Sequence, residues 1–269
     1  MDRLFVLGTG NALVTEIFNT CGVLELSGEY LLLDCGGGNG ILHQLNAAKI
    51  DTAQIHDVFL SHEHCDHLLG IVWIIRNAAT KILSGVYVGN LRIYCHKNLV
   101  ATVKTLCELC LQKKITNLFD TRICIIPISD GEQVQIIHHN FTFFDILSTK
   151  AEQYGFTVTL TDNGKLCFMG DEPINPACEA YAANAAWLLC EAFCRLQDAA
   201  RFKPYEKHHS TVTDAAKLAS RLGVQNLLLW HTEQTTRATR KTAYAKEAAA
   251  FFKGAVVVPN DLDVITLSV

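Results

Sequence analysis

Residues 61–67 read Ser-His-Glu-His-Cys-Asp-His, and this stretch decides which fold the chain can adopt. It follows the apolar run VFL, which predicts the end of a buried strand. His62 and His64 are two residues apart, so on an extended chain their side chains point the same way and can bind one ion. Asp66 and His67 come next, at the start of the apolar stretch LLGIVWII, and can face a second ion.

Imidazole and carboxylate are the ligand types that zinc binds in proteins, and manganese and iron accept them too. The motif therefore predicts a centre for two divalent metal ions, with zinc as the first expectation and manganese or iron as alternatives. The simpler interpretation is a polar loop that happens to be rich in histidine. That loop would need no matching side chains elsewhere, whereas a metal centre would.

Further polar side chains end other apolar runs. YLLLD ends in Asp34, LCFMGD in Asp171 and LLLWH in His231. In α/β proteins, ligands gather in the crevice beyond the ends of the strands. These three residues are therefore expected to converge on the histidine motif, which indicates a site rather than a core.

The composition favours one α/β domain over residues 1–269, because 49% of residues are apolar, 19% are charged and no linker interrupts the pattern. Strands and helices alternate. A helix over 213–222 has good end signals, with Thr211 or Thr213 as N-cap and Gly223 after its last residue. Strands are expected at 3–8, 23–26, 30–33, 57–60, 91–95, 122–126, 141–146, 155–160, 165–169, 226–229 and 255–258, and helices at 40–48, 67–78, 99–112, 177–200, 213–222 and 240–252.

Charge and hydropathy limit the partners. With 23 basic and 27 acidic residues the net charge is -4, so charge does not indicate nucleic-acid binding, although a nucleic-acid substrate stays open. No apolar run approaches the ~20 residues of a membrane span, and the N-terminal run is too short for a secretory signal. We therefore expect a cytoplasmic protein with no membrane partner and reduced cysteines.

The sequence resembles the metallo-β-lactamase-fold hydrolase superfamily, whose hallmark is a strand followed by His-x-His-x-Asp-His. The likeness continues through LGTGNA, LLLDCG, MGDEP, LLCEAF, HHST and LLLWHTE in the superfamily's order. The HHST segment is similar to the ribonuclease Z branch. The resemblance implies an α/β fold, specifically an αβ/βα four-layer sandwich, with a dinuclear metal site at one edge and a homodimeric assembly.

The resemblance also assigns the metal ligands. It implies that His62 and His64 bind the first ion, that Asp66 and His67 bind the second, and that Asp171 bridges the two. His231 completes the second site.

Other roles are implied around these ligands. Asp34 is expected to orient a ligand histidine through a hydrogen bond, although a strand-end turn is the alternative. Glu191 is expected to support the site or to be an ordinary buried glutamate. His209, or its neighbour His208, is expected to donate a proton to the leaving oxygen, with a capping or solvated histidine as the alternative.

One expected ligand is missing. The superfamily has a histidine for the first ion before Asp171, and alignment of FFDILSTKAEQYGF places Leu147 at that position. Leucine cannot coordinate a cation, so we expect a weakened first site that keeps three protein ligands. His139 is the alternative ligand if the register differs.

These features predict a metal-dependent hydrolase that uses a metal-bound hydroxide, oriented by Asp66, on a phosphodiester or related ester. The substrate is expected to be a small or nucleotide phosphodiester, including cyclic ones. One alternative is a degenerate metal- or ligand-binding protein without hydrolase activity, because of Leu147. Another is a ribonuclease Z-type tRNA 3′-processing endonuclease, although the 23 residues between Leu147 and Asp171 leave no room for a long tRNA-gripping arm.

Overall fold

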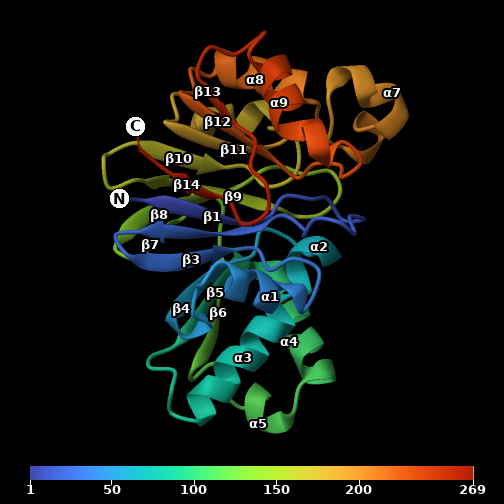
Figure 1. Ribbon diagram of the computed structural model, residues 1–269. Coiled ribbons are helices and arrows are strands. Elements are labelled where there is room, and N and C mark those ends of the chain that lie inside the picture. The colour runs from blue at the N-terminus through green and yellow to red at the C-terminus, as the bar shows by residue number, and fades with distance from the viewer. Residues whose placement is uncertain (269) are drawn as a thin grey trace.

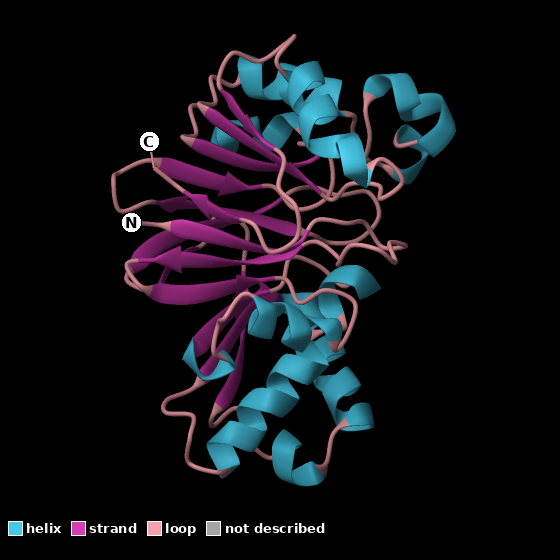
Figure 2. Cartoon of the chain, in the orientation of Figure 1, coloured by secondary structure: helices cyan, strands magenta, loops and turns pink. Residues whose placement is uncertain are grey.

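In the computed structural model, which describes residues 1–268, the chain forms two seven-stranded sheets that pack face to face (Figure 2). The first sheet has the order β14-β1-β2-β3-β4-β5-β6. Its strands are β1 (Arg3–Gly8), β2 (Cys21–Leu26), β3 (Glu29–Leu33), β4 (Ile55–Phe59), β5 (Leu91–His96), β6 (Ile123–Ile128) and β14 (Val264–Thr266).

The second sheet has the order β13-β12-β11-β10-β9-β8-β7. Its strands are β7 (Gln133–Ile136), β8 (His139–Asp145), β9 (Tyr154–Thr159), β10 (Lys165–Phe168), β11 (Trp187–Glu191), β12 (Asn226–Trp230) and β13 (Ala255–Val257). Strands β3 to β6 are parallel to one another, and so are β10 to β13. Parallel strands have their carboxyl ends at the same edge of a sheet, so each sheet offers one such edge.

Helices cover the outer faces of both sheets (Figure 1). The first sheet is covered by α1 (Gly40–Ala47), α2 (Cys65–Leu68), α3 (Ile71–Leu83), α4 (Lys97–Cys110) and α5 (Lys113–Thr116). The second sheet is covered by α8 (Val212–Arg221) and α9 (Arg237–Ala248), with the short α6 (Glu179–Ala182) against β9, while α7 (Ala199–Phe202) lies beyond the end of the sheet. The layers therefore follow the predicted αβ/βα order, and the fold prediction is confirmed.

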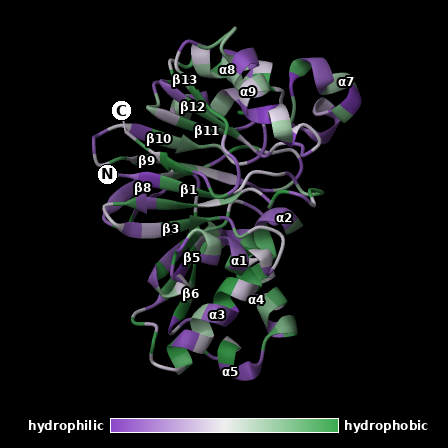
Figure 3. Cartoon of the chain, viewed as in Figure 1, coloured by the Kyte–Doolittle hydropathy of each residue, from purple (hydrophilic) through white to green (hydrophobic). Residues whose placement is uncertain are grey.

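The layers are held by three apolar cores, one between the sheets and one under each set of helices. Between the sheets, the ring of Phe59 lies 5.4 Å from that of Phe143 and 5.3 Å from that of Phe156. Such aromatic pairs stabilise a core by about 0.5–1.5 kcal/mol beyond the area they bury. In Figure 3 the central strands are largely hydrophobic, as strands covered on both faces must be.

The predicted helix over 177–200 is wrong. Residues Trp187–Glu191 form strand β11, which pairs with β10 on one side and β12 on the other. All five of its residues are buried. The neighbouring alanines favour a helix, but the apolar run WLLC is stabilised more by burial between two parallel strands than by helix propensity.

The predicted ends of the helix over 213–222 are confirmed. Thr211 caps α8. Its side chain accepts a hydrogen bond from the Asp214 backbone amide, and the Asp214 side chain accepts one from the Thr211 backbone amide, which together form a capping box. Gly223 follows the helix with φ of 67°. The cap fixes the start of α8, and with it the preceding His-His-Ser-Thr segment.

None of the helices within residues 1–268 is both long and apolar enough to cross a bilayer.

The buried Arg240 of α9 ties the loop after β12 to two distant segments. Its side chain, 1% exposed, donates hydrogen bonds to Thr232 Oγ1, to Thr9 Oγ1 at 3.1 Å and to the Pro259 carbonyl at 2.9 Å. Thr232 directly follows His231. The three acceptors come from three separate parts of the chain, so one guanidinium holds them together.

We expect Arg240→Met to lower the free energy of unfolding by roughly 2 kcal/mol, because it leaves buried oxygen acceptors without a donor. Urea unfolding of the metal-free chain measures this. Arg237→Met on the exposed side of the same helix is the control, with an expected loss below about 1 kcal/mol. Equal stabilities for the two variants would contradict the bracing role of Arg240.

Candidate metal centre

The histidine motif lies where β4 ends and α2 begins. Its backbone is fixed there: His67 N–H donates to the His64 carbonyl at 3.0 Å, and the His67 carbonyl accepts from Cys35 N–H at 2.8 Å. Asp171 arrives from the loop after β10 and His231 from the end of β12. The two sheets therefore contribute to one site at their shared edge.

Three groups of potential ligands share this edge, and Asp171 with His209 and His231 is one of them. His62, His64 and Asp171 have ligand atoms within 4.8 Å of one another, and so do Asp66, His67 and His231.

Asp171 lies between the groups. Its Oδ1 is 3.7 Å from His62 Nε2, and its Oδ2 is 3.6 Å from His67 Nε2 and 3.4 Å from His231 Nε2. Asp66 Oδ2 lies 3.4 Å from His67 Nε2 and 3.5 Å from His231 Nε2. The structure thus brings together all six residues assigned as ligands from the sequence.

Asp34 lies behind the ligands. It is 2% exposed, and its Oδ2 accepts a hydrogen bond from His67 Nδ1 at 2.8 Å and from Ser61 Oγ at 2.7 Å. Because His67 donates through Nδ1, its Nε2 presents a lone pair toward Asp66 and Asp171. Ser61 Oγ in turn lies 2.9 Å from His62 Nδ1.

The site has charge and donor atoms that fit divalent cations. His67 Nε2 and both ring nitrogens of His231 are buried and have no hydrogen-bond partner within the described residues. Burial opposes the charged form of Asp171, yet the imidazoles around it, His62 first, hold its pKa well below the usual range. Buried carboxylates facing unsatisfied imidazole nitrogens are the donor set that a zinc-type ion takes.

His209 lies beside this centre, 8% exposed, with its ring 5.0 Å from that of His231. Its Nδ1 donates to the Asp171 carbonyl at 2.8 Å, so Nε2 is the nitrogen left for a substrate. Burial, followed by the nearby His231, lowers the pKa of His209 to about 3. His208 is exposed and lies against Thr149 Oγ1 at 3.1 Å.

Glu191 ends β11 beneath His209 and is fully buried. Its Oε1 accepts from Ser210 N–H at 2.6 Å, and its Oε2 lies 3.8 Å from His209 Nδ1. Burial raises the pKa of Glu191 to about 8. The residue therefore anchors the His-His-Ser-Thr segment to the second sheet, and it comes from a strand rather than from the predicted helix.

The sequence predicts that Leu147 lies beside His62 and His64 and weakens metal binding there, and the structure corrects this prediction. Leu147 is 47% exposed and lines a separate cavity with Glu172 and His208. The side chain that lies against His62 and Asp171 is Gln153. The loop between β8 and β9 spans residues 146–153, and the residue that reaches the centre is its last one, six residues after Leu147.

His139, the alternative ligand, is also remote from the centre. It lies at the start of β8, where its ring contacts Ser27 Oγ at 3.1 Å and the Thr159 carbonyl at 2.8 Å.

A cavity of about 350 Å³ opens onto the candidate centre. It is lined by the ligands His64, Asp66, Asp171 and His231, and by His209, Lys150, Lys207, Phe193 and Leu13 among others. The Phe193 ring stacks on the His209 ring, with 5.1 Å between their centres. Lys207 Nζ lies 4.7 Å from the centre of the Phe193 ring. Sequence analysis missed Lys150, Lys207 and Phe193, because no motif distinguishes them from surface lysines or a core aromatic.

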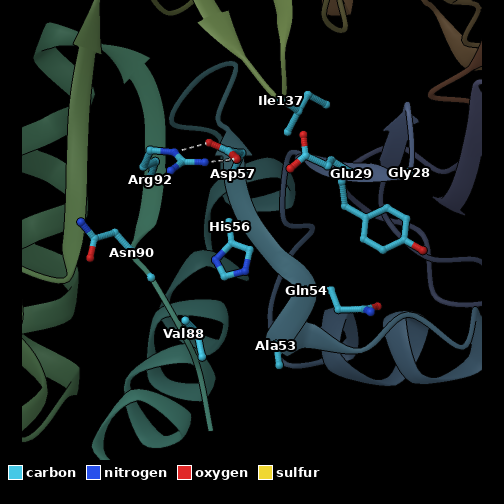
Figure 4. Close-up of a pocket in the computed structure, with 12 residues that line it drawn as sticks. Gly28, Glu29, Ala53, Gln54, His56, Asp57, Val88, Asn90, Arg92 and Ile137 are labelled. Atoms are coloured by element: carbon cyan, nitrogen blue, oxygen red, sulfur yellow. Dashed lines mark hydrogen bonds and ion pairs between the residues drawn. The ribbon is translucent and has the colours of Figure 1, made fainter. Parts of the chain in front are cut away.

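A second cavity, of about 490 Å³, lies at the opposite edge, by the amino ends of β3, β4 and β5 (Figure 4). Its one conspicuous charge pair joins Arg92 Nε to Asp57 Oδ1 at 2.6 Å. The arginine is thereby neutralised, and none of the candidate ligand groups within residues 1–268 lies there. Although this cavity is larger than the one at the candidate metal centre, it is the smaller cavity that contains the candidate ligands.

Comparisons with known proteins agree with the fold. The family model of the anti-Pycsar protein Apyc1 matches residues 2–252. A ribonuclease Z of Bacteroides fragilis is 24% identical, with 97% of each chain covered. The metallo-β-lactamase-fold protein YhfI of Bacillus subtilis superposes with a TM-score of 0.80 at 20% identity, covering 98% of each chain.

The short form of human tRNase Z superposes with a TM-score of 0.75 at 21% identity, covering 100% of both chains. A diphosphatase of the PhnP family has a TM-score of 0.75 at 15% identity, covering 100% of this chain and 99% of that one. The predicted resemblance to metallo-β-lactamase-fold hydrolases of the ribonuclease Z type is confirmed, and so is the predicted enzyme class. The chain belongs to the family described as anti-Pycsar protein Apyc1.

Proposed function

We propose that this protein is a metal-dependent phosphodiesterase acting on small substrates. One observation carries the proposal: four imidazoles and two carboxylates from three distant segments gather around one point, all of them buried except the half-buried His64, with His67 Nε2 and His231 Nε2 left unsatisfied. Divalent cations held there would supply Lewis acidity and lower the pKa of water. His62, His64 and Asp171 would hold one cation, and Asp66, His67, His231 and Asp171 the other.

The residues around the cavity have separable roles. Asp66, at the cavity wall, would accept a hydrogen bond from the attacking water and orient it. His209 Nε2 would donate a proton to the leaving oxygen. The negative charge of a bound phosphodiester favours the protonated ring, which opposes the effect of burial on its pKa.

The cavity suits a small anion. Its volume of about 350 Å³ is at the low end of the range for small-molecule sites, roughly 300–1,000 Å³. Lys150 and Lys207 both line the cavity; Lys150 Nζ donates to the Lys207 carbonyl at 3.0 Å and pairs with Glu172 Oε1 at 3.3 Å. Phe193 adds an aromatic face to the cavity. A phosphodiester with an apolar or aromatic substituent matches this lining.

The family to which the chain belongs is described as anti-Pycsar, and we propose that the phosphodiesterase activity serves an anti-Pycsar role. Relatives named ribonuclease Z support a second candidate, cleavage of tRNA precursors. Assaying a tRNA precursor beside a small phosphodiester separates the two candidates. A small cavity with Lys150 and Lys207 on its wall, in a chain whose net charge is -4, favours the small anionic substrate.

Zinc as the metal, a homodimer, a cytoplasmic location and a single domain over 1–269 stay predictions from the sequence and its resemblance. The same holds for the individual roles of the site residues.

Removing the metal should abolish hydrolysis of bis(p-nitrophenyl) phosphate, and added zinc or manganese should restore it. We expect His64→Ala to lower turnover by roughly 100-fold or more, since even outer partners of metal ligands contribute 10–100-fold. His138→Ala, at an exposed histidine, is the control and should retain full activity. The metal content of each sample is measured by elemental analysis. Turnover that persists without metal would contradict the proposal.

His209→Ala tests the leaving-group role. A general acid contributes roughly 10²–10⁴-fold, and mainly when the leaving group is a poor one. We expect the variant to lose most of its rate on an alkyl phosphodiester but far less on a p-nitrophenyl ester, whose leaving group needs no proton. Equal losses on both substrates would show that His209 acts only by positioning.

Lys150→Met and Lys207→Met should each raise KM for an anionic phosphodiester by roughly 10-fold, equivalent to about 1.4 kcal/mol, with a smaller change in kcat. The difference from wild type should shrink as ionic strength rises, since salt screens exposed charges. Lys114→Met on α5 is the matched control. Unchanged KM in both cavity variants would remove the lysines from substrate binding.

A further inference from the structure

Gln153 is a buried polar residue at the candidate metal centre to which no role has been assigned. It lies just before β9, and the whole residue is 1% exposed. Its Nε2 donates to Asp171 Oδ1 at 2.7 Å and lies 3.1 Å from His62 Nδ1. It therefore contacts two of the three residues of the first ligand group.

The chain is anchored on both sides of Gln153, on one side to the segment that carries His62 and on the other to the end of β5 and the start of α4. Tyr154 N–H donates to the Ser61 carbonyl at 3.0 Å. Glu152 Oε2 accepts from Asn98 Nδ2 at 2.5 Å and lies 3.2 Å from His96 Nδ1. The His96 ring, 2% exposed, stacks on that of Tyr154 at 5.9 Å. These contacts leave Gln153 little freedom to withdraw from the centre.

Gly170 shows that the neighbouring loop is shaped around the same amide. Its φ is +74°, and a Cβ there would lie 2.6 Å from Gln153 Nε2. Glycine is the residue that adopts this backbone conformation without strain. Both the backbone and the missing side chain at position 170 thus make room for Gln153 next to Asp171.

The amide changes what the first group can offer a cation. A glutamine nitrogen is a donor and carries no lone pair for a metal. It engages Asp171 Oδ1, the oxygen nearest His62, while Oδ2 faces His67 and His231 free of any such donor. The first group then offers two imidazoles and an already engaged carboxylate. The second offers Asp66, two imidazoles and the other oxygen of Asp171.

We propose that Gln153 makes the two cation positions unequal, with a resident ion at Asp66, His67 and His231 and a weaker, exchangeable ion at His62 and His64. This inference rests on the proposed function, because it assumes that the centre binds divalent cations. Its consequence is that activity rises with free metal concentration over a range in which the resident position is already full. Gln153 is in this sense a positioning residue that acts through Asp171.

Zinc titration of the metal-free chain, in competition with a chelator of known affinity, tests the proposal. We expect two classes of site in the wild type, at least roughly 10-fold apart. Gln153→His supplies a third imidazole, so the weaker class should tighten by roughly 10-fold or more, in line with the 10–100-fold effects of residues around metal ligands. The tighter class should change little, because its ligands are untouched.

Three further variants make the result specific. Gln153→Glu supplies a carboxylate oxygen and should also tighten the weaker class, which provides a second reading if the histidine variant folds poorly. Gln153→Met keeps the size and removes the donor from Asp171 Oδ1 without adding a good ligand, so the weaker class should tighten, but by less than in Gln153→His. Gln135→His, on an exposed part of β7, adds a histidine away from the centre and should leave both classes as in the wild type.

The outcomes separate this inference from the proposed function. Two equal zinc sites in the wild type, unchanged in the Gln153 variants, would overturn the inference and leave the phosphodiesterase proposal standing. No zinc binding by the wild type would overturn both. A tight class that survives in every variant while only the weak class moves excludes a general loss of structure, which would weaken both classes together.

Discussion

The carboxylate of Asp171 is the constraint on which the rest of the site depends. It is buried and charged, and such a group is costly unless partners surround it. The partners come from both sheets: His62 and His67 from the first, His231 and the Gln153 amide from the second. Two sheets packed face to face are what bring these partners to one carboxylate.

The backbone at this edge of the sheets is strained at several of the residues that surround Asp171. Asp34 and His231 both follow a strand, and both have φ near +55°, a region that side chains other than glycine seldom adopt. Gly170 turns in the same region beside Asp171. Such strain persists only when the surroundings determine the conformation strongly. Here the determining contacts are the Asp34 hydrogen bonds to Ser61 and the Arg240 bonds behind His231.

Relatives of this chain share the fold across its whole length, so the fold alone does not define what the site binds. Two residues that bear on binding lie on the loop between β8 and β9. That loop carries Lys150 to the cavity wall and Gln153 to the first ligand group. On the two proposals made above, substrate charge and metal affinity would both depend on neighbouring residues of this one segment, and a change in its length would alter both.

The sequence by itself determined the fold class and identified the six candidate ligands that the structure gathers at one edge, because the histidine motif has a short, fixed spacing and each remaining candidate follows an apolar strand. It could not locate Gln153, because a long loop lets several residues occupy one position, and only packing against Tyr154, His96 and Gly170 selects among them. It also mistook β11 for helix, since local propensity does not register burial between two parallel strands. The tertiary structure decided these points because each depends on contacts between residues far apart in the chain, whose distances no local spacing encodes.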